Sequence, residues 1–113
     1  MDCIFCKIAA KQIPAKLVHE DSDVVAFRDI NPEAPTHVLI IPRQHIETVN
    51  DLKPGDAATV GKLFLAAKEI GIKEGLAERG YRLVLNCGPE AGQAVFHIHL
   101  HMLGGRKMNW PPG

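Results

Sequence analysis

The sequence predicts an α+β fold in which an antiparallel sheet of about five strands packs with one long helix and a short N-terminal helix. Short runs of β-prone residues stand on both sides of a single long stretch with helical periodicity. Successive strands are separated by short turns, which suit antiparallel pairing, whereas parallel strands need a long crossover. Near the C-terminus, three histidines alternate with apolar residues, which is the pattern of a half-buried strand. These three observations favour an antiparallel α+β fold over a parallel βαβ array.

The first half of the chain holds the short helix and the first strands. Residues 4–10 form one or two helical turns, which end near Pro14 because proline disfavours helix in the residue before it. Three β-prone runs follow, at residues 17–20, 24–29 and 37–42. The first two are separated by Asp21-Ser22-Asp23, which predicts a hairpin. The third is β-branched and apolar, and it follows a break with two prolines at residues 31–35.

The second half begins with the long helix, expected from Pro54 to about Glu74. Its apolar residues recur at spacings of three and four, as in an amphipathic helix: Val60, Leu63, Phe64, Ala67, Ile70 and Gly71. Pro54 suits the first turn, whereas Gly71 and Gly75 suggest fraying or an early end. Residues 81–86 return to a strand pattern, and residues 88–93 form a loop that leads into the last strand.

That last strand, residues 97–103, reads His-Ile-His-Leu-His-Met-Leu. Because successive side chains of a strand point to opposite faces, His97, His99 and His101 should project from one side while Ile98, Leu100 and Met102 face a core. An imidazole can act as a nucleophile, a general acid or base, or a metal ligand. A solvated histidine face is the simpler alternative, but three histidines in register favour chemistry.

Length and composition exclude several classes of protein. A chain of 113 residues is expected to form one domain, residues 1–113. Thirteen basic and thirteen acidic residues are interspersed, so we expect no nucleic-acid partner. Three cysteines do not make a secreted disulfide framework. No apolar run approaches a membrane span and the N-terminus lacks a signal pattern, so no membrane association and a cytoplasmic location are expected.

Residues 97–103 resemble the histidine triad (HIT) signature, in which three histidines alternate with apolar residues. The surrounding sequence resembles the histidine triad nucleotide-binding branch of that superfamily. The matching pieces are residues 29–32, residues 34–37, Asn86, Gly92-Gln93 and the ending 104–113. The resemblance spans residues 4–113, and within this branch the sequence is similar in particular to the purine nucleoside phosphoramidases. It implies a homodimer of α+β subunits that hydrolyses purine nucleoside monophosphates linked through phosphorus to an amine or a similar leaving group.

By this resemblance, His99 attacks the α-phosphorus and forms a nucleotidyl-histidine that water then cleaves. Its other ring nitrogen must carry a proton, held by a backbone carbonyl or by His37. His101 would donate to the phosphate oxygens. Asp29 and Ile30 resemble the ribose and base pocket, although Asp29 could instead be a turn residue that binds its own backbone. The remaining expected contacts are Asn86, Gly92 and Gln93 for phosphate and ribose, and Phe5, Ile8 and Phe27 as apolar walls that could equally be core residues.

Position 94 departs from the branch pattern. Ala94 stands where that branch usually carries a hydroxyl residue that contacts the phosphoryl region or the leaving group. Alanine has no donor, so the resemblance implies slower turnover or a different leaving group. The departure also leaves open two other readings, a dinucleoside polyphosphate hydrolase or nucleotidyltransferase and a non-catalytic nucleotide-binding adaptor.

A metal cluster is the last candidate site. Cys3 and Cys6 form a C-x-x-C pair, which is half of a structural zinc site, and His45 and His97 are candidates for the other two ligands. Some members of the wider family have a similar arrangement. His97 would then be a ligand rather than a catalytic histidine beside His99 and His101. The alternative is two reduced thiols on a short helix. No organic cofactor is expected. The tail at residues 104–113, with Trp110, is expected at a dimer interface.

Overall fold

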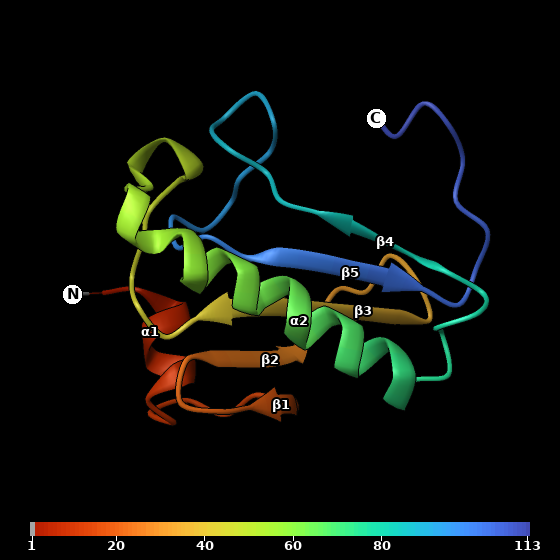
Figure 1. Cartoon of the computed structure of the whole chain (residues 1–113), viewed down its shortest axis with the longest axis horizontal. Helices are drawn as coiled ribbons and strands as arrows, with labels where there is room; N and C mark the ends of the chain where they lie inside the picture. Colours follow the sequence, from red (N-terminus) through yellow and green to blue (C-terminus); the bar gives the residue numbers. More distant parts are fainter. Residues whose placement is uncertain (1) are drawn as a thin grey trace.

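The computed structural model describes residues 2–113, which form one five-stranded sheet with a helix on each face (Figure 1). The elements are α1 (Ile4–Ala9), β1 (Leu17–Glu20), β2 (Val24–Arg28), β3 (Thr36–Pro42), η1 (Val49–Asp51), η2 (Pro54–Asp56), α2 (Ala57–Lys73), β4 (Tyr81–Val84) and β5 (Leu100–Gly104). The strand order is β1-β2-β3-β5-β4, and each neighbouring pair is antiparallel. The predicted fold class is confirmed, with the long helix and the short N-terminal helix where they were expected.

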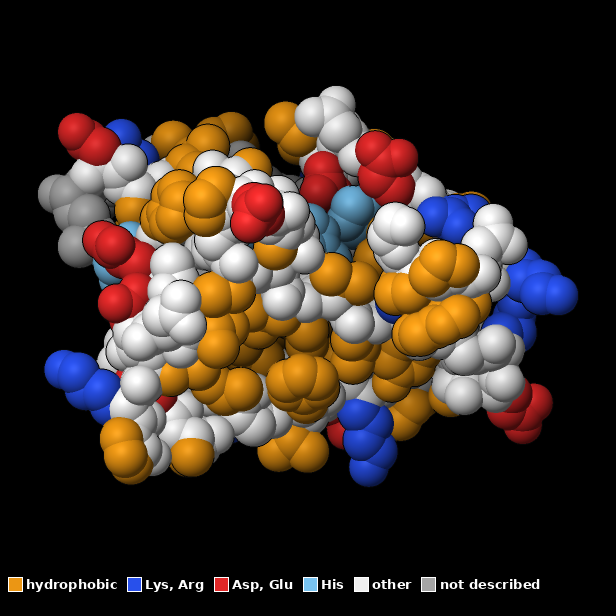
Figure 2. Space-filling view, turned by 90° about the horizontal axis from the view of Figure 1, so that it is seen from above, with side chains coloured by type: hydrophobic (Ala, Val, Ile, Leu, Met, Phe, Trp, Pro, Cys, Tyr) orange, Lys and Arg blue, Asp and Glu red, His pale blue; other side chains and the backbone are white. Residues whose placement is uncertain are grey.

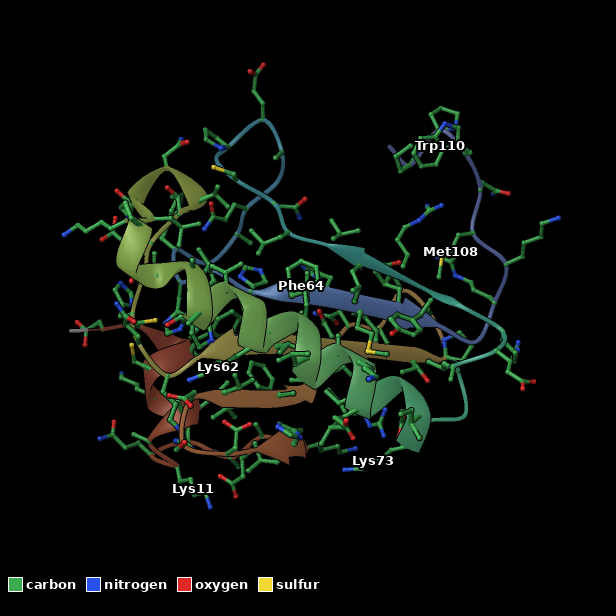
Figure 3. The ribbon with its side chains drawn as sticks, in the orientation of Figure 1. Lys11, Lys62, Phe64, Lys73, Met108 and Trp110 are labelled. Atoms are coloured by element: carbon green, nitrogen blue, oxygen red, sulfur yellow. The ribbon has the colours of Figure 1, made fainter. Side chains whose placement is uncertain are left out.

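The long helix α2 packs its apolar stripe on one face of the sheet. Leu63, Ala67 and Ile70 are fully buried there, against Ile40 of β3 and Met102 of β5. Burying a leucine or isoleucine side chain contributes about 1.5–3 kcal/mol. Two lysines of α2 also reach the β1–β2 hairpin (Figure 3): Lys62 Nζ lies 3.0 Å from a carboxylate oxygen of Asp23, and Lys73 Nζ donates to the carbonyl of Val18 at 2.9 Å.

Of the two glycines expected to end the helix, Gly71 does not. It lies within α2, where an added Cβ would stand 2.9 Å from the Tyr81 ring, so this glycine lets β4 approach the helix. The helix ends at Lys73 with Glu74 as its cap, and Gly75, which follows the cap, has a φ of 72°. The N–H groups of Gly75 and Leu76 donate to the carbonyls of Ile72 and Gly71, which is the Schellman arrangement.

The short helix α1 covers the opposite face of the sheet. Its Phe5 and Ile8 are buried against Phe27 of β2 and Leu39 of β3. Arg43 holds the C-terminal end of α1, because its guanidinium donates to the carbonyl of Ala9 at 2.9 Å. The two helices thus bury separate cores on the two faces of one sheet.

The histidine strand begins later than expected. β5 starts at Leu100, so His101 lies in the strand while His97 and His99 precede it. In the β3–β5 register, Ile40 pairs with Leu100, which would place Ile98 opposite Pro42. Proline has no N–H, so it cannot continue the ladder. The N–H of Ile98 donates instead to the carbonyl of Ile46 at 2.8 Å.

The C-terminal segment leaves the sheet at Gly105 and runs along the β4 edge (Figures 1 and 3). Arg82 of β4 holds it: the guanidinium donates to the carbonyl of Asn109 at 2.9 Å and lies 5.8 Å from the centre of the Trp110 ring. Trp110 remains largely exposed. Among residues 2–113, no helix is both long and apolar enough to cross a membrane.

Candidate active site and metal cluster

The three histidines share the α1 face of the sheet, as the alternating pattern predicted. Ile98, Leu100 and Met102 belong to the core under α2. On the other face, the Phe5 ring of α1 contacts the rings of His97 and His99, with centroids 6.0 and 5.1 Å apart. Seen from above, pale blue histidine side chains lie at the bottom of a hollow in the surface, with acidic side chains at its rim (Figure 2).

Hydrogen bonding fixes which ring nitrogen of His99 carries the proton. Nδ1 lies 2.8 Å from the carbonyl oxygen of His97. A carbonyl can only accept, so Nδ1 must hold the proton and Nε2 must carry the lone pair. The backbone carbonyl expected to hold this ring is therefore that of His97, and His37 has a different partner.

His37 and His101 form a pair whose protons are also fixed. The backbone N–H of Glu33 donates to Nδ1 of His37 at 3.0 Å, so His37 carries its proton on Nε2. That nitrogen lies 3.0 Å from Nδ1 of His101, which must accept. A neutral His101 therefore carries its own proton on Nε2. Register explains the approach of the two rings, because His37 pairs with Leu103 and Leu39 with His101, on the same face.

Burial lowers the pKa of both His99 and His101, which favours their neutral forms. Desolvation lowers the pKa of His99 below the ordinary histidine value, although the hydrogen bond to the His97 carbonyl opposes this. Desolvation, followed by repulsion from His99 and His37, lowers the pKa of His101 to about 4. Asp29 partly opposes both shifts. Its carboxylate lies 3.5 Å from Nε2 of His37, and its other oxygen accepts the N–H of Asn31, so Asp29 is also the turn residue of the alternative reading.

A cavity of about 840 Å³ opens between α1, β2 and the segment before β3; His37 lines it, and the Phe5 ring in its wall contacts His99. This volume lies within the range of ligand-binding pockets. Six residues predicted to bind the substrate or serve the reaction line it, namely Phe5, Ile8, Phe27, Asp29, Ile30 and His37. Phe5, Ile8 and Phe27 are at the same time core residues, so their two alternative roles coincide.

The other predicted contacts lie in the loop that precedes β5. Gln93 is buried, and its side chain bonds only within the protein: Nε2 donates to the carbonyls of Glu47 and Val95, and Oε1 accepts the N–H of Gly88. The N–H groups of Gly92 and Gln93, expected to face phosphate, donate to the carbonyls of Pro89 and Gly88. Two further expected residues belong to this loop: Asn86, which is half-buried, and Ala94, which is exposed.

Cys3, Cys6, His45 and His97 converge at the N-terminal end of α1, as predicted from their residue types. Their ligand atoms are at tetrahedral spacing. The two histidine Nδ1 atoms are 3.2 Å apart, and sulfur-to-nitrogen distances are 3.4 Å for Cys3 and His97, 3.4 Å for Cys6 and His45, and 3.6 Å for Cys6 and His97. A tetrahedral zinc with ordinary bond lengths requires about 3.3 Å between nitrogens and about 3.5 Å between sulfur and nitrogen.

The chemistry of the cluster fits a metal as well. Nε2 of His97 donates to the carbonyl of Pro42 at 2.7 Å, which leaves the lone pair of Nδ1 directed at the cluster. Burial, followed by the adjacent Cys3, raises the pKa of the Cys6 thiol. A divalent cation would offset both effects by stabilising two neighbouring thiolates. Cys87, in contrast, lies outside this cluster.

The HIT domain family model matches residues 10–108. The chain belongs to the HIT family. It is 48% identical over 107 residues to a protein of Escherichia coli named purine nucleoside phosphoramidase, covering 95% of this chain and 90% of that protein. It is 51% identical over 112 residues to a 14 kDa zinc-binding protein of Zea mays, covering 97% and 87%. A HIT family hydrolase of Legionella pneumophila, known from its crystal structure, shares 54% identity with a TM-score of 0.97, covering 99% and 100%.

Several features of this HIT site lie outside the signature and were missed by sequence reasoning. Further residues complete the cavity wall: Ile4, Ile13, Pro14, Ala15, Lys16, Arg28, Pro32 and Leu39. Pro14 was interpreted only as a helix terminator. Its position in the connection between α1 and β1 was the one sign that it could line a cavity beside these elements. The backbone groups of Glu33 and Pro42, which orient His37 and His97, give no signal in the sequence because every residue but proline has the same pair.

Proposed function

We propose that this HIT protein hydrolyses purine nucleoside 5′-phosphoramidates or related nucleotidyl conjugates and releases a nucleoside monophosphate through a nucleotidyl-His99 intermediate. The observation that carries the proposal is the 2.8 Å bond from Nδ1 of His99 to the carbonyl of His97. It leaves Nε2 as a neutral nucleophile, and Phe5, whose ring contacts the His99 ring, lines a cavity of about 840 Å³ with a largely apolar wall. The name of the Escherichia coli relative supports this substrate class.

In this mechanism, the Nε2 lone pair of His99 forms a bond to the α-phosphorus while the bond from phosphorus to the leaving amine breaks. His101 donates its Nε2–H to a phosphate oxygen, where charge develops in the transition state. His37 fixes the orientation of His101 through the 3.0 Å contact of their nitrogens. Since Ala94 has no donor, the leaving amine takes its proton from water. A second water then attacks phosphorus and gives its proton to the hydroxide that the first water left, while the bond from phosphorus to Nε2 breaks and His99 recovers its lone pair.

The cavity supports a purine nucleoside as the bound group. Phe5, Ile8 and Phe27 provide an apolar wall for the base. Asp29 supplies carboxylate oxygens at the same cavity, where the two hydroxyls of a ribose would donate. Asn86, in the loop that precedes β5, supplies a phosphate-side contact, and the shape of this loop depends on the buried side chain of Gln93.

The test is AMP release from an adenosine 5′-phosphoramidate. The wild-type protein should release AMP, and His99→Ala should reduce the rate by more than about 1,000-fold, as for loss of other enzyme nucleophiles. His19→Ala is the matched control, since His19 lies in β1 and its ring bonds to Asp21 of the same hairpin. Acid quenching should trap a nucleoside monophosphoryl group on His99. Unchanged release in His99→Ala refutes the mechanism, and AMP binding without release identifies a non-catalytic adaptor. Faster cleavage of a dinucleoside polyphosphate changes the substrate class.

We also propose a structural Zn²⁺ at Cys3, Cys6, His45 and His97. The support is the tetrahedral spacing of the four ligand atoms and the zinc-binding relative of Zea mays. Bound there, Zn²⁺ would hold the two N-terminal cysteines to His45 and His97, which are distant in the sequence. It would take part in no step of the reaction. Elemental analysis of purified protein should give about one zinc per chain, and less than about half an equivalent argues against a tight site.

We further propose that residues 1–113 form one HIT domain that pairs as a homodimer. β4 is an edge strand of the sheet, and apolar side chains of α2, Phe64, Leu65 and Ile72, are exposed, as is Trp110 of the tail (Figure 3). A second copy would cover them. Light scattering during size exclusion should give twice the chain mass. Among the described residues, Cys3, Cys6 and Cys87 form no disulfide, which supports a reducing, cytoplasmic location that cell fractionation tests.

A further inference from the structure

Residue 97 connects the metal cluster to the catalytic histidine by two different groups. Its side chain is fully buried, with Nδ1 in the cluster and Nε2 bonded to the Pro42 carbonyl. Its backbone carbonyl holds Nδ1–H of His99 at 2.8 Å. A displacement of the His97 ring therefore moves the acceptor that determines how His99 is aimed.

A second connection runs through Phe5. This residue lies between Cys3 and Cys6 in α1, so both of its flanking cysteines belong to the cluster. Its ring packs edge-on against the His99 ring at 5.1 Å and against Phe27 at 5.4 Å, and it lines the nucleotide cavity. Phe5 thus contacts both the nucleophile and the wall against which a base would lie.

The helix that carries Phe5 needs outside support. α1 has six residues, far fewer than the roughly 12–15 that an isolated helix needs for even marginal stability. Its start rests on Cys3, whose sulfur accepts the N–H of Cys6 at 3.4 Å. The residues that would bind a metal are therefore the residues that begin the helix.

We propose that Cys3, Cys6 and His45 are positioning residues for the reaction, acting on His99 through the His97 carbonyl and on the cavity wall through Phe5. This proposal rests on the function proposed above. With a metal bound, the ring of His97 and the first turn of α1 are held in place. Without it, the cluster keeps only the weaker contacts among its own thiols and imidazoles, such as Cys3 to His97 at 3.4 Å, so His97 and α1 gain freedom. A displacement of about 1 Å at a reacting group can cost about 100-fold in rate.

The experiment compares His45→Ala with His45→Cys. Alanine removes one ligand, whereas cysteine restores a common zinc ligand set of three cysteines and one histidine. His19→Ala is again the histidine control, and Cys6→Ser is paired with Cys87→Ser. Because a variant can fail to fold, wild-type protein is also measured after chelation and again after zinc is returned.

Four quantities are measured for each sample: zinc content, AMP affinity, kcat and KM for the phosphoramidate, and the NMR signal of the His99 Nδ1 proton. That proton is identified by its loss in His99→Ala. In His45→Ala, Cys6→Ser and chelated protein, we expect zinc to be lost, the His99 proton signal to broaden or vanish, AMP to bind about 10-fold more weakly and kcat to fall about 10- to 100-fold. His45→Cys and returned zinc should restore all four.

Zinc loss with an unchanged His99 signal, AMP affinity and kcat would overturn the proposal, as would the same losses in His19→Ala and Cys87→Ser. So would wild-type protein that is isolated without zinc and still shows the His99 signal. If wild-type protein releases no AMP, the proposed function fails, but the NMR signal and AMP affinity still decide whether the cluster positions His99.

Discussion

Lowering the pH from 7.5 to 5.5 tests whether burial keeps the catalytic imidazoles neutral. The imidazoles are those of His99 and His101, which face each other, His37 and Asp29. Burial lowers the pKa of His99, and burial followed by His99 and His37 lowers the pKa of His101 to about 4. A histidine with the ordinary value of about 6.5 would be only about one-tenth neutral at pH 5.5, whereas one with a pKa of about 4 stays roughly 97% neutral. His101 should therefore stay neutral at pH 5.5, and because the pKa of His99 is lowered as well, any fall of kcat/KM in acid should have its midpoint below pH 6.5.

The assay is the initial rate of AMP release across this range. Phosphoramidates hydrolyse without enzyme in acid, so the rate with His99→Ala is subtracted at each pH. His19→Asn should give the same profile as the wild type, since the ring of this histidine bonds to Asp21 in the β1–β2 hairpin. A fall in kcat/KM with its midpoint at pH 6.5 or above would show that His99 titrates like an exposed histidine, and the reasoning from burial would be refuted.

Three other predictions concern the loop, the tail and stability. Ala94→Ser restores a hydroxyl beside the site and should raise kcat several-fold for amine leaving groups; an unchanged kcat would show that water alone serves the leaving group. Gly105→Ala should lower the free energy of unfolding in urea by about 1–3 kcal/mol, because φ is 90° and the new Cβ would stand 2.9 Å from Pro35. Gly55→Ala, with open space, should change it by less than about 0.5 kcal/mol. Finally, the pKa of His101 is lower in the folded than in the unfolded chain, so the unfolded chain binds more protons between about pH 4 and 6.5. The melting temperature should therefore fall as the pH falls through this window. A constant melting temperature would contradict the lowered pKa.

Much of the fold followed from periodicity in the sequence. The stripe of α2 was visible because Leu63, Ala67 and Ile70 recur at helical spacing and all three are buried. Strand ends were harder to predict. β5 loses its first residues because Pro42 on the neighbouring strand has no N–H, which is a property of the register rather than of residues 97–99. Gly71 was interpreted as a helix breaker because its actual role depends on the close approach of Tyr81. That approach is a tertiary contact, which the local sequence does not reveal.

The candidate site was predictable where residue type alone carries the chemistry. Two cysteines and two histidines were enough to suggest the cluster that the structure brings together. The pairing of His37 with His101 was not foreseen, because it depends on two strands being adjacent and in register. The role of Gln93 in shaping its loop was also unforeseen, since a glutamine gives no sign in the sequence of whether its amide faces a ligand or the backbone.

Main-chain groups, rather than side chains, orient three of the four imidazoles at this site: the carbonyl of His97 holds His99, the carbonyl of Pro42 holds His97, and the N–H of Glu33 holds His37. A carbonyl persists through any mutation, and an N–H through any mutation except to proline. Under the proposed function, side chains of the cavity wall such as Ile8 and Ile30 would select the substrate and can change by single mutations, while the main-chain bond that orients His99 is kept. Such a protein could change its specificity for the base or the leaving group by mutation while the orientation of its imidazoles stays the same.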